Sequence, residues 1–262
     1  MALTADQIQE LADLLFNAEQ SSDPVPPLTD RFPDMTAVEA YQVQQEVIRK
    51  RIQGGRRVVG KKVGLTSLAM QQMLGVGEPD YGVVLDDMTI ADGATFEAGR
   101  LLQPRVEPEI AFMLSKDLKG PGVTVEDVLA ATEYVFPALE IVASRVKDWK
   151  IKLQDTIADN ASAGGVVLGD AHSQVSAVDL VNEELVYEKN GEEIARATGA
   201  AVLDNPANAV AWCANKLSEY GDSLAAGEFV IPGALCAMTP VQPGDTVVAR
   251  FSTIGSVSVT FS

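Results

Sequence analysis

The hydrophobic pattern of this chain changes abruptly at Gly54-Gly55, and this change limits the folds that the chain can adopt. Before the glycines, apolar residues recur at the three- and four-residue spacing of an amphipathic helix. Thr4 with Gln7, and Thr36 with Glu39, form capping boxes that predict the first turns of two helices. After the glycines, apolar residues occur in short runs that are typical of strands. The sequence therefore predicts a helical beginning and a β-rich remainder.

Alternation and turn residues predict the elements of the β-rich remainder. We expect strands over residues 57–65, 105–114 and 134–142, a hairpin turning at Asn190-Gly191, and two closing strands that end at Phe251 and Phe261. Helices are expected over residues 67–74, from Thr124, and from Asn205-Pro206 to Gly221. A segment of about 55 residues is below the size that usually folds alone, so we expect residues 1–55 to pack as an arm on a main domain of residues 56–262. The predicted fold class is α+β.

The charge of the chain excludes several classes of partner. The sequence has 20 Lys and Arg against 37 Asp and Glu, which gives a formal net charge of −17. Nucleic acids and anionic membrane surfaces are bound by clustered basic residues, so neither is expected as a partner. The sequence shows no secretory signal and no apolar run of membrane-spanning length. Its two cysteines, Cys213 and Cys236, do not form a disulfide framework, and we expect a cytoplasmic location.

Three glutamates lie on predicted strands where an unpaired charge is costly. Glu107 and Glu109 are two residues apart, so both project from one face of their strand. Glu140 interrupts an otherwise apolar strand. Three carboxylates with room for water are ligands that Mg²⁺ or Mn²⁺ accepts. The residues alone leave open a second interpretation, in which Glu107 and Glu109 face solvent while Glu140 pairs with Arg105 or Arg145.

A glycine-rich predicted strand carries two consecutive lysines. Residues 60–67 read GKKVGLTS, and alternation sends Lys61 and Lys62 to opposite faces, so one of them can point toward a site. Glycines let a ligand approach the backbone, and free N–H groups there can hold an oxyanion. An inward lysine near a metal could move protons. The alternative is an ordinary strand with solvated lysines.

Two further segments are candidate ligand loops. Residues 155–165 (DTIADNASAGG) place polar groups between apolar stretches and form either a pocket wall or only an Asx-turn at Asp159 and Asn160. Residues 231–234 (IPGA) are the second candidate, with an ordinary turn as the alternative. His172 is the one histidine and is expected in a surface loop, so neither a Ser-His-Asp triad nor a multi-histidine metal site can be assembled.

Taken in order, these motifs resemble the fumarylacetoacetate hydrolase superfamily, and most of all its hydratase and decarboxylase branch of meta-cleavage aromatic degradation. The matching segments are residues 59–67 (VGKKVGLTS), 74–76 (LGV), 79–82 (PDYG), 104–112 (PRVEPEIAF), 137–140 (PALE), 148–149 (DW), 155–162 (DTIADNAS) and 255–257 (GSV). The likeness runs from the N-terminal helices to the last strand. It implies a mainly β, mixed-sheet roll with an N-terminal helical arm, assembled into a homo-oligomer.

The resemblance also implies roles for particular residues. The family's Glu-x-Glu pair and its later Glu fall on Glu107, Glu109 and Glu140, as ligands of Mg²⁺ or Mn²⁺. Its active-site Lys falls on Lys62, with Lys61 as the outward neighbour, and the Asp of its Pro-Asp-Tyr-Gly motif, the second catalytic residue, is Asp80. The residues expected to contact the substrate are Leu65, Thr66, Ser162 and Gly233.

The sequence departs from the family pattern at two prolines. Pro108 lies in the middle of Glu-x-Glu and is tolerated only where its missing N–H is not needed by the sheet. Pro232 stands where relatives often carry Thr or Ser, so a contact from that side chain is not carried over.

The activity implied by the resemblance is a metal-dependent hydratase. It adds water to a small 2-oxo or 2-hydroxy dienoic acid, 2-hydroxypenta-2,4-dienoate (2-oxopent-4-enoate), and gives 4-hydroxy-2-oxopentanoate. The C–C bond hydrolases of the superfamily need a catalytic His, and none lies near these motifs. Two alternatives stay open: a 4-oxalocrotonate (2-oxohex-3-enedioate) decarboxylase, and a catalytically silent partner subunit. Asp155 favours the hydratase, and the branch also implies a complex with a sister pathway decarboxylase.

Overall fold

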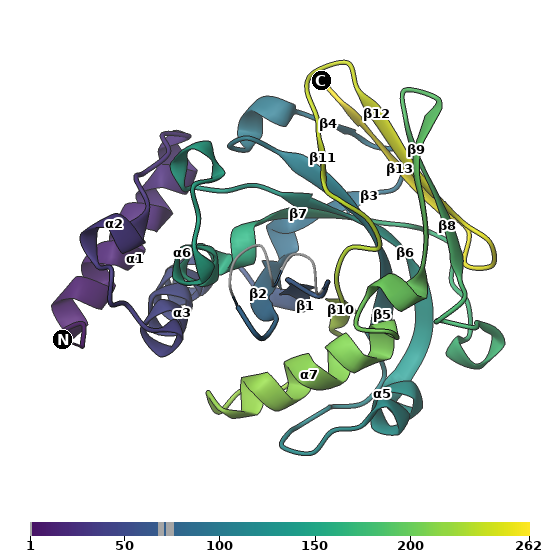
Figure 1. Ribbon diagram of the computed structural model, residues 1–262, viewed down its shortest axis with the longest axis horizontal. Coiled ribbons are helices and arrows are strands. Elements are labelled where there is room, and N and C mark those ends of the chain that lie inside the picture. Colours follow the sequence, from purple (N-terminus) through teal and green to yellow (C-terminus); the bar gives the residue numbers. More distant parts are fainter. Residues whose placement is uncertain (1, 68–70, 72–75) are drawn as a thin grey trace.

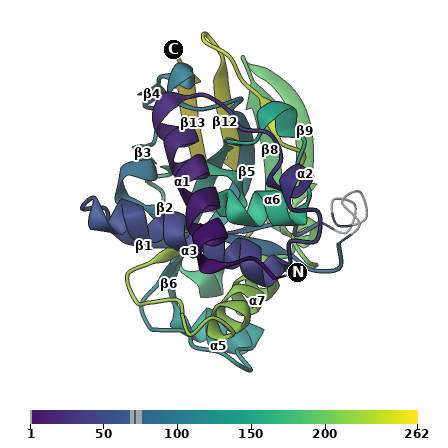
Figure 2. The ribbon, with the colours of Figure 1, turned by 90° about the vertical axis from the view of Figure 1, so that its left-hand side faces the viewer.

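The helices of the N-terminal arm lie together at one side of the molecule in the computed structural model, which describes residues 2–67, 71 and 76–262 (Figure 1). They are α1 (Ala5–Ser21), α2 (Leu28–Arg31) and α3 (Ala37–Gln53). Both predicted capping boxes are present, at Thr4 and at Thr36, and α3 ends at Gln53 with Gly54 as its C-cap, where the glycines predict the end. Figure 2 shows α1 and α3 against the rest of the chain from this side.

The larger sheet holds the strands that carry the predicted site. These strands are β1 (Val58–Gly64), β2 (Asp80–Leu85), β3 (Thr89–Ala91), β5 (Arg105–Leu114), β6 (Thr132–Val142), β7 (Ala163–Leu168), β10 (Phe229–Ile231) and β11 (Thr239–Pro240). Within the described residues their order is β2-β1-β10-β5-β6-β7-β3, with β11 beside β5. β1 is parallel to β10 and β3 is parallel to β7, whereas the other neighbours are antiparallel. The sheet is therefore mixed, as expected.

A second sheet packs on β6 and β7 (Figure 1). In order, it consists of β4 (Thr95–Phe96), β13 (Ser256–Phe261), β12 (Thr246–Phe251), β8 (Glu184–Lys189) and β9 (Glu192–Thr198). The predicted hairpin joins β8 to β9, and its turn residues Asn190 and Gly191 have φ values of 55° and 81°. Asn-Gly suits this turn because both central positions need positive φ.

Three helices pack on the larger sheet and beside the arm. α5 (Val125–Ala131) and α7 (Pro206–Ser218) lie together on one side of the sheet, and α6 (Leu153–Ala158) packs between α3 and β2 (Figure 1). Thr124 and Asn205 are the predicted N-caps of α5 and α7. α7 ends at Ser218 rather than at Gly221. Short 3₁₀ turns are η1 (Asp86–Met88), η2 (Ala98–Arg100), η3 (Lys147–Trp149), η4 (Asn160–Ser162), η5 (Val175–Ala177) and η6 (Gly199–Ala201).

The arm contributes to the same apolar core as the sheets. Leu11 and Leu15 of α1 belong to one buried cluster with Val259 and Phe261 of β13. The division of the chain at residue 55 stays a prediction. No helix in the described part of the chain is long and apolar enough to cross a membrane.

β2 is an edge strand, and side chains from elsewhere bind its outward backbone groups. The Tyr81 carbonyl accepts a hydrogen bond from Nε2 of Gln44 (2.9 Å), and the Tyr81 N–H donates to the Tyr41 hydroxyl (3.4 Å). The N–H and C=O of Val83 bond to the side-chain amide of Asn160 (2.8 and 2.9 Å). These contacts join β2 to α3 and to the turn that follows α6.

The strands predicted over residues 57–65, 105–114 and 134–142 are confirmed as β1, β5 and β6. The helix predicted over residues 67–74 lies mostly outside the described residues.

Candidate metal centre

Three glutamates meet on one face of the larger sheet because of the register between β5 and β6. Glu107 lies directly opposite Glu140, and directly opposed residues of antiparallel strands place their side chains on the same face. Glu109 is two residues along β5 and shares that face. One carboxylate oxygen of each residue lies within 4.8 Å of the others. The structure thus brings the three predicted metal ligands together.

Several oxygens of this cluster accept no hydrogen bond from the residues that the structure describes. Glu109 and Glu140 are 0% and 1% exposed, whereas Glu107 is partly exposed. Oε2 of Glu109 accepts a hydrogen bond from the Gly233 N–H (2.6 Å). Among the described residues, nothing donates a hydrogen bond to Oε1 of Glu109 or to either oxygen of Glu140, although Oε1 of Glu140 forms an ion pair with Lys62. Buried carboxylates of this kind are stable as anions only when a cation lies among them.

Burial and mutual repulsion raise the pKa values of the three carboxyl groups. Loss of hydration and the Glu140 carboxylate raise the pKa of Glu107 to about 7. Burial, with Glu140 and Glu107, raises the pKa of Glu109 well above its usual range. Burial likewise raises the pKa of Glu140. Without a cation, the cluster therefore favours bound protons, and a divalent cation would reverse that preference.

Lys62 of β1 places an ammonium group beside the cluster. Its Nζ lies 3.2 Å from Oε1 of Glu140 and donates to the Ala161 carbonyl (2.8 Å). Burial lowers the pKa of Lys62, but the carboxylates of Glu140 and Asp80 raise it by more, so the net direction is upward. Lys62 is therefore protonated when the cluster holds no cation.

Lys61 points to the opposite face, but it is buried there. Its side chain is 3% exposed, and its Nζ lies 3.3 Å from a carboxylate oxygen of Glu228. The alternative in which both lysines are solvated is wrong, and the expectation that Lys61 faces outward needs the same correction. The physical reason is long-range: α7 packs on that face of β1, and its buried Cys213 is close enough for the Lys61 charge to affect the thiol.

Two glycines make room for the side chains around Lys62. Gly82 lies opposite Lys62, and a Cβ there would come 3.0 Å from Cδ of Lys62 and 2.5 Å from the Asn160 carbonyl oxygen. Gly64 lies opposite Asp80, and a Cβ there would lie 2.3 Å from Oδ1 of Asp80 and 3.5 Å from Nζ of Lys62. Asp80 and Lys62 therefore converge on the space above Gly64.

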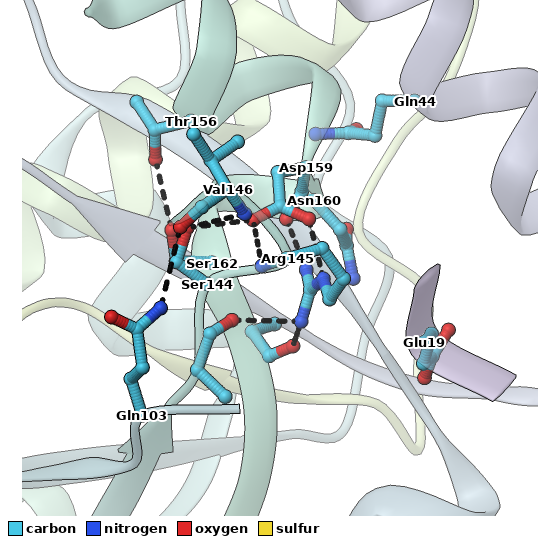
Figure 3. A network of polar contacts seen from close by, with 12 residues as sticks. Glu19, Gln44, Gln103, Ser144, Arg145, Val146, Thr156, Asp159, Asn160 and Ser162 are labelled. Atoms are coloured by element: carbon cyan, nitrogen blue, oxygen red, sulfur yellow. Dashed lines mark hydrogen bonds and ion pairs between the residues drawn. The ribbon is translucent and has the colours of Figure 1, made fainter. Parts of the chain in front are cut away.

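Hydroxyl groups link Asp80 to Ser162. Thr156 donates to Oδ2 of Asp80 (3.3 Å), and its Oγ1 lies 3.5 Å from Oγ of Ser162, a contact visible in Figure 3. Burial raises the pKa of Asp80 against the opposing effect of Lys62. The structure thus gathers Lys62, Asp80 and Ser162 near the three glutamates.

The other polar residues of the 155–165 segment hold the backbone. Asp155 accepts hydrogen bonds from the N–H and hydroxyl of Thr29 (3.0 and 2.7 Å) and so ties α6 to α2. Asp159 pairs with Arg145, and Asn160 bonds to β2. These three residues therefore support the backbone, and the pocket-wall interpretation stays a prediction for Thr156 and Ser162.

The second interpretation of Glu140 is also wrong. Its ion pair is with Lys62, while Arg145 binds Asp159 and the Arg105 guanidinium lies 4.5 Å from the centre of the Trp149 ring.

Pro108 is accommodated because of the side to which its backbone points. Its carbonyl accepts a hydrogen bond from the Leu235 N–H (3.0 Å), and the N–H and C=O of one strand residue point to the same side. The missing proton would therefore point toward residues 232–238, between β10 and β11, and not toward β6.

Leu65, Thr66 and Gly233 lie near one another. Leu65 has a φ of 59°, and Thr66 is buried. Gly233 has a φ of 122°, and a Cβ there would lie 2.1 Å from Oγ1 of Thr66. Its N–H already binds Glu109. The substrate contacts assigned to these three residues stay predictions.

His172 and the two cysteines stand apart from this chemistry. His172 is exposed and stacks on Tyr134, with 4.0 Å between ring centres. Cys213 is buried and Cys236 is partly buried, and both thiols are free.

The sequence does not single out Gly64, Gly82 or Thr156, and it indicates Arg145 only as a partner of Glu140. Gly64 and Gly82 lie within the matching segments 59–67 and 79–82. The space that they leave for Asp80 and Lys62, however, depends on the register of β1 against β2. One sequence signal does point to Thr156: its hydroxyl lies three and four residues, about one helical turn, before the polar side chains of Asp159 and Asn160.

Comparison with known proteins gives a consistent result. The model of the fumarylacetoacetate (FAA) hydrolase C-terminal family matches residues 66–262. The chain is 46% identical over 257 residues to 2-hydroxyhexa-2,4-dienoate hydratase of Comamonas testosteroni, with 97% of each chain covered. It is 46% identical over 259 residues to 2-keto-4-pentenoate hydratase of Paraburkholderia xenovorans strain LB400, covering 99% of this chain and 96% of the relative.

A solved structure resembles the whole chain. It is 4-oxalocrotonate decarboxylase from Pseudomonas putida G7, complexed with magnesium and adipate, with a TM-score of 0.97, 38% identity and 99% of each chain covered. A second structure of that enzyme, with calcium and acetate, has a TM-score of 0.95. The mixed sheets, the N-terminal helices and these matches together establish that the chain belongs to the fumarylacetoacetate hydrolase family.

Proposed function

We propose that this chain is a metal-dependent lyase that adds water to 2-hydroxypenta-2,4-dienoate and forms 4-hydroxy-2-oxopentanoate. One observation carries the proposal: three carboxylates share a buried sheet face, and the Lys62 ammonium lies 3.2 Å from Glu140 among them. Two relatives that are 46% identical over nearly the whole chain are named as hydratases of such compounds.

The carboxylate cluster fits a divalent cation. Glu107, Glu109 and Glu140 offer only oxygen, and three of their buried oxygens accept no hydrogen bond from the described residues. Oxygen ligands of this kind suit hard cations such as Mg²⁺, Mn²⁺ or Ca²⁺. The similar decarboxylase was solved with magnesium and with calcium, which supports a divalent metal here. We propose Mg²⁺ or Mn²⁺ as the working ion.

When bound, the cation supplies Lewis-acid polarisation of the C2 oxygen of the substrate. The chain's own residues then handle the substrate carboxylate, the protons and the water. Ser162 would bind the C1 carboxylate. Thr156 contacts both Ser162 and Asp80, which lies beside the cluster. Leu65, Thr66 and Gly233 would border the same substrate.

Lys62 is placed to move protons. In the first step the C2 hydroxyl loses a proton and C5 gains one, which converts the dienol to 2-oxopent-3-enoate. Lys62 would carry this proton: its ammonium gives a proton to C5, and the resulting amine takes the proton of the C2 hydroxyl. The Ala161 carbonyl and Glu140 fix its Nζ beside the cluster. In the second step a hydroxyl from water adds to C4 and a proton adds to C3. Asp80, which accepts a hydrogen bond from Thr156, would position this water.

A decarboxylase that acts on 4-oxalocrotonate is the second candidate. The whole-chain TM-score of 0.97 to such an enzyme favours it, but the identity is 38%, against 46% to the hydratases. A silent subunit would have no need of the complete set of three glutamates with Lys62. The homo-oligomer and the complex with a sister decarboxylase stay predictions from the resemblance.

A spectrophotometric assay tests the proposal. The purified protein with Mg²⁺ is mixed with 2-hydroxypenta-2,4-dienoate, and the dienol absorbance is followed, with 4-oxalocrotonate in a parallel cuvette. We expect loss of the dienol signal, formation of 4-hydroxy-2-oxopentanoate, and no reaction in a chelator. Turnover of 4-oxalocrotonate alone, with release of CO₂, would establish the decarboxylase instead. Turnover of neither compound would leave the silent subunit.

A pair of variants tests the metal ligands. Glu109→Gln should abolish the metal-dependent activity, because a neutral amide replaces a ligand. Glu183→Gln is the control, since Glu183 is also buried, at 2% exposed, but its carboxylate accepts hydrogen bonds from Thr253 far along the chain. Full activity of Glu109→Gln would remove Glu109 from the metal site.

A further inference from the structure

The turn between α6 and β7 contains three consecutive residues in the left-handed conformation. Asn160, Ala161 and Ser162 have φ values of 53°, 49° and 54°. For residues other than glycine this conformation is unfavourable, least so for Asn, and it persists only where the surroundings enforce it. The turn directs the Ala161 carbonyl to Nζ of Lys62 (2.8 Å). An unfavourable backbone thus supplies the acceptor that holds Lys62.

One guanidinium group holds both ends of this turn (Figure 3). Arg145 donates through Nε to the Asp159 carboxylate and through Nη2 to the Asp159 carbonyl, immediately before the turn. Its Nη1 donates to the Ala163 carbonyl immediately after the turn (2.7 Å) and to the Ala143 carbonyl at the end of β6 (2.8 Å). Because the guanidinium is planar and rigid, these bonds fix the separation between residues 159 and 163.

Asp159 completes the arrangement from the other side. Its Oδ2 accepts hydrogen bonds from the Arg145 N–H (2.9 Å) and from the Ser144 hydroxyl (3.2 Å). Asp159 is 2% exposed and Arg145 is 7% exposed, so water does not compete with these bonds. Figure 3 shows the dashed contacts converging on Arg145 and Asp159, with Thr156 and Ser162 adjacent.

We propose that Arg145 and Asp159 are positioning residues for Lys62: they impose the left-handed turn whose Ala161 carbonyl orients the Lys62 ammonium toward the substrate. Within the described part of the chain, neither Arg145 nor Asp159 forms a hydrogen bond or ion pair with the predicted metal ligands. The inference rests on the proposed function for its kinetic part alone. It predicts that loss of the pair misplaces Lys62 while the metal site stays intact.

We call the pair Arg145 and Asp159 the clamp. Two variants remove the clamp without leaving a buried charge unpaired. Arg145→Lys keeps the positive charge but has no planar fork to reach both ends of the turn. Arg145→Met combined with Asp159→Asn removes both charges. The amide oxygen at position 159 can still accept a hydrogen bond from the backbone N–H of residue 145. Asp155→Asn is the matched control, because Asp155 is a buried carboxylate of α6, the helix just before the turn. It accepts hydrogen bonds from Thr29 and from the Lys152 N–H instead of from the residues that hold the turn.

The first readout does not depend on activity. Amide hydrogen exchange is followed by mass spectrometry over residues 159–163 of the full chain. The Ser162 N–H donates to the Asp159 carbonyl (2.9 Å), so it reports on the closed turn. We expect exchange in this segment to be about tenfold faster or more in both clamp variants, and unchanged in Asp155→Asn. Mg²⁺ affinity, from the magnesium-dependent shift of Tm, should stay within about threefold of wild type.

The second readout is the split between kcat and KM, on whichever of the two assay substrates the wild type converts. We expect kcat of the clamp variants to fall about 10- to 100-fold with KM changed less than about threefold, because a displacement near 1 Å at a reacting group has this effect. Asp155→Asn, even with a similar loss of Tm, should keep kcat within about twofold. Clamp variants that are folded and keep wild-type kcat and wild-type exchange would overturn the proposal. So would a parallel decline of kcat, Mg²⁺ affinity and exchange protection in the control. If the wild type converts neither substrate, the proposed function fails, while hydrogen exchange still decides whether the clamp holds the turn.

Discussion

Replacing one glutamate of the cluster should stabilise the metal-free protein at alkaline pH. Glu107→Gln leaves the shape of the side chain but removes a negative charge that faces Glu140 across the two strands. The pKa of Glu107 is raised from 4.5 to about 7, and one pKa unit corresponds to about 1.4 kcal/mol, so ionising this group costs the folded chain up to about 3.5 kcal/mol. Because the carboxyls titrate as a set and Glu107 is partly exposed, this value is an upper limit.

The sign of the effect follows from proton linkage. The folded-state pKa lies above the unfolded one, so the folded chain holds the proton more tightly. The stability that protonated Glu107 contributes to the metal-free wild type is therefore fully present below about pH 4.5 and is lost as the pH rises through about 7. Glu107→Gln behaves as a permanently protonated residue, so its advantage should be absent at low pH and complete above about pH 8.

Thermal unfolding in a chelator at several pH values measures this effect. At roughly 2–4 °C per kcal/mol for a chain of this size, the variant should melt up to about 14 °C above wild type at alkaline pH and together with it near pH 4. Added Mg²⁺ should reverse the order, because saturation to about 1,000 times Kd stabilises only the wild type, by about 4.1 kcal/mol, which exceeds the advantage of the variant. Equal melting of the two proteins at alkaline pH in the chelator would refute the reasoning.

Three further outcomes are expected. Mg²⁺ binding, followed by calorimetry, should strengthen as the pH rises through about 7, because Glu107 must lose its proton first; affinity already constant from about pH 5.5 upward would contradict the raised pKa. Gly64→Ala should lower activity at least tenfold with little loss of Mg²⁺ binding, since its Cβ would lie 2.3 Å from Oδ1 of Asp80; unchanged kcat would mean that Asp80 can move without consequence. Thr36→Ala removes the N-cap of α3 and should lower the free energy of unfolding by about 1 kcal/mol while kcat is unchanged, as measured by urea unfolding and the dienol assay.

Much of the fold could be predicted from local signals. The capping boxes at Thr4 and Thr36, the Asn-Gly turn and the alternation of β5 are properties of a few adjacent residues, and the structure contains all of them. The two-residue spacing of Glu107 and Glu109 likewise fixes a shared face, because the period of a strand is two.

Long-range contacts decided what the sequence pattern left open. No local signal aligns Glu140 with Glu107, because this pairing depends on the register of two strands joined through α5. The burial of Lys61 depends on α7, which lies far along the chain. The three left-handed residues of the turn after α6 had no signal either, since Ala161 and Ser162 belong to residue types that rarely adopt this conformation and only the surrounding contacts impose it.

The capped edge of β2 has a consequence for how this protein avoids aggregation. An edge strand normally offers unpaired N–H and C=O groups that can recruit a strand from another molecule. Here Gln44 and Tyr41 bind the outward backbone groups of Tyr81. The side-chain amide of Asn160 bonds to the N–H and C=O of Val83, as a residue of a neighbouring strand would. An incoming strand would have to displace three side chains, one of which belongs to the turn that holds Lys62. The contacts that shape the active-site turn thus also block the edge of β2, so that a strand from another molecule cannot pair with it.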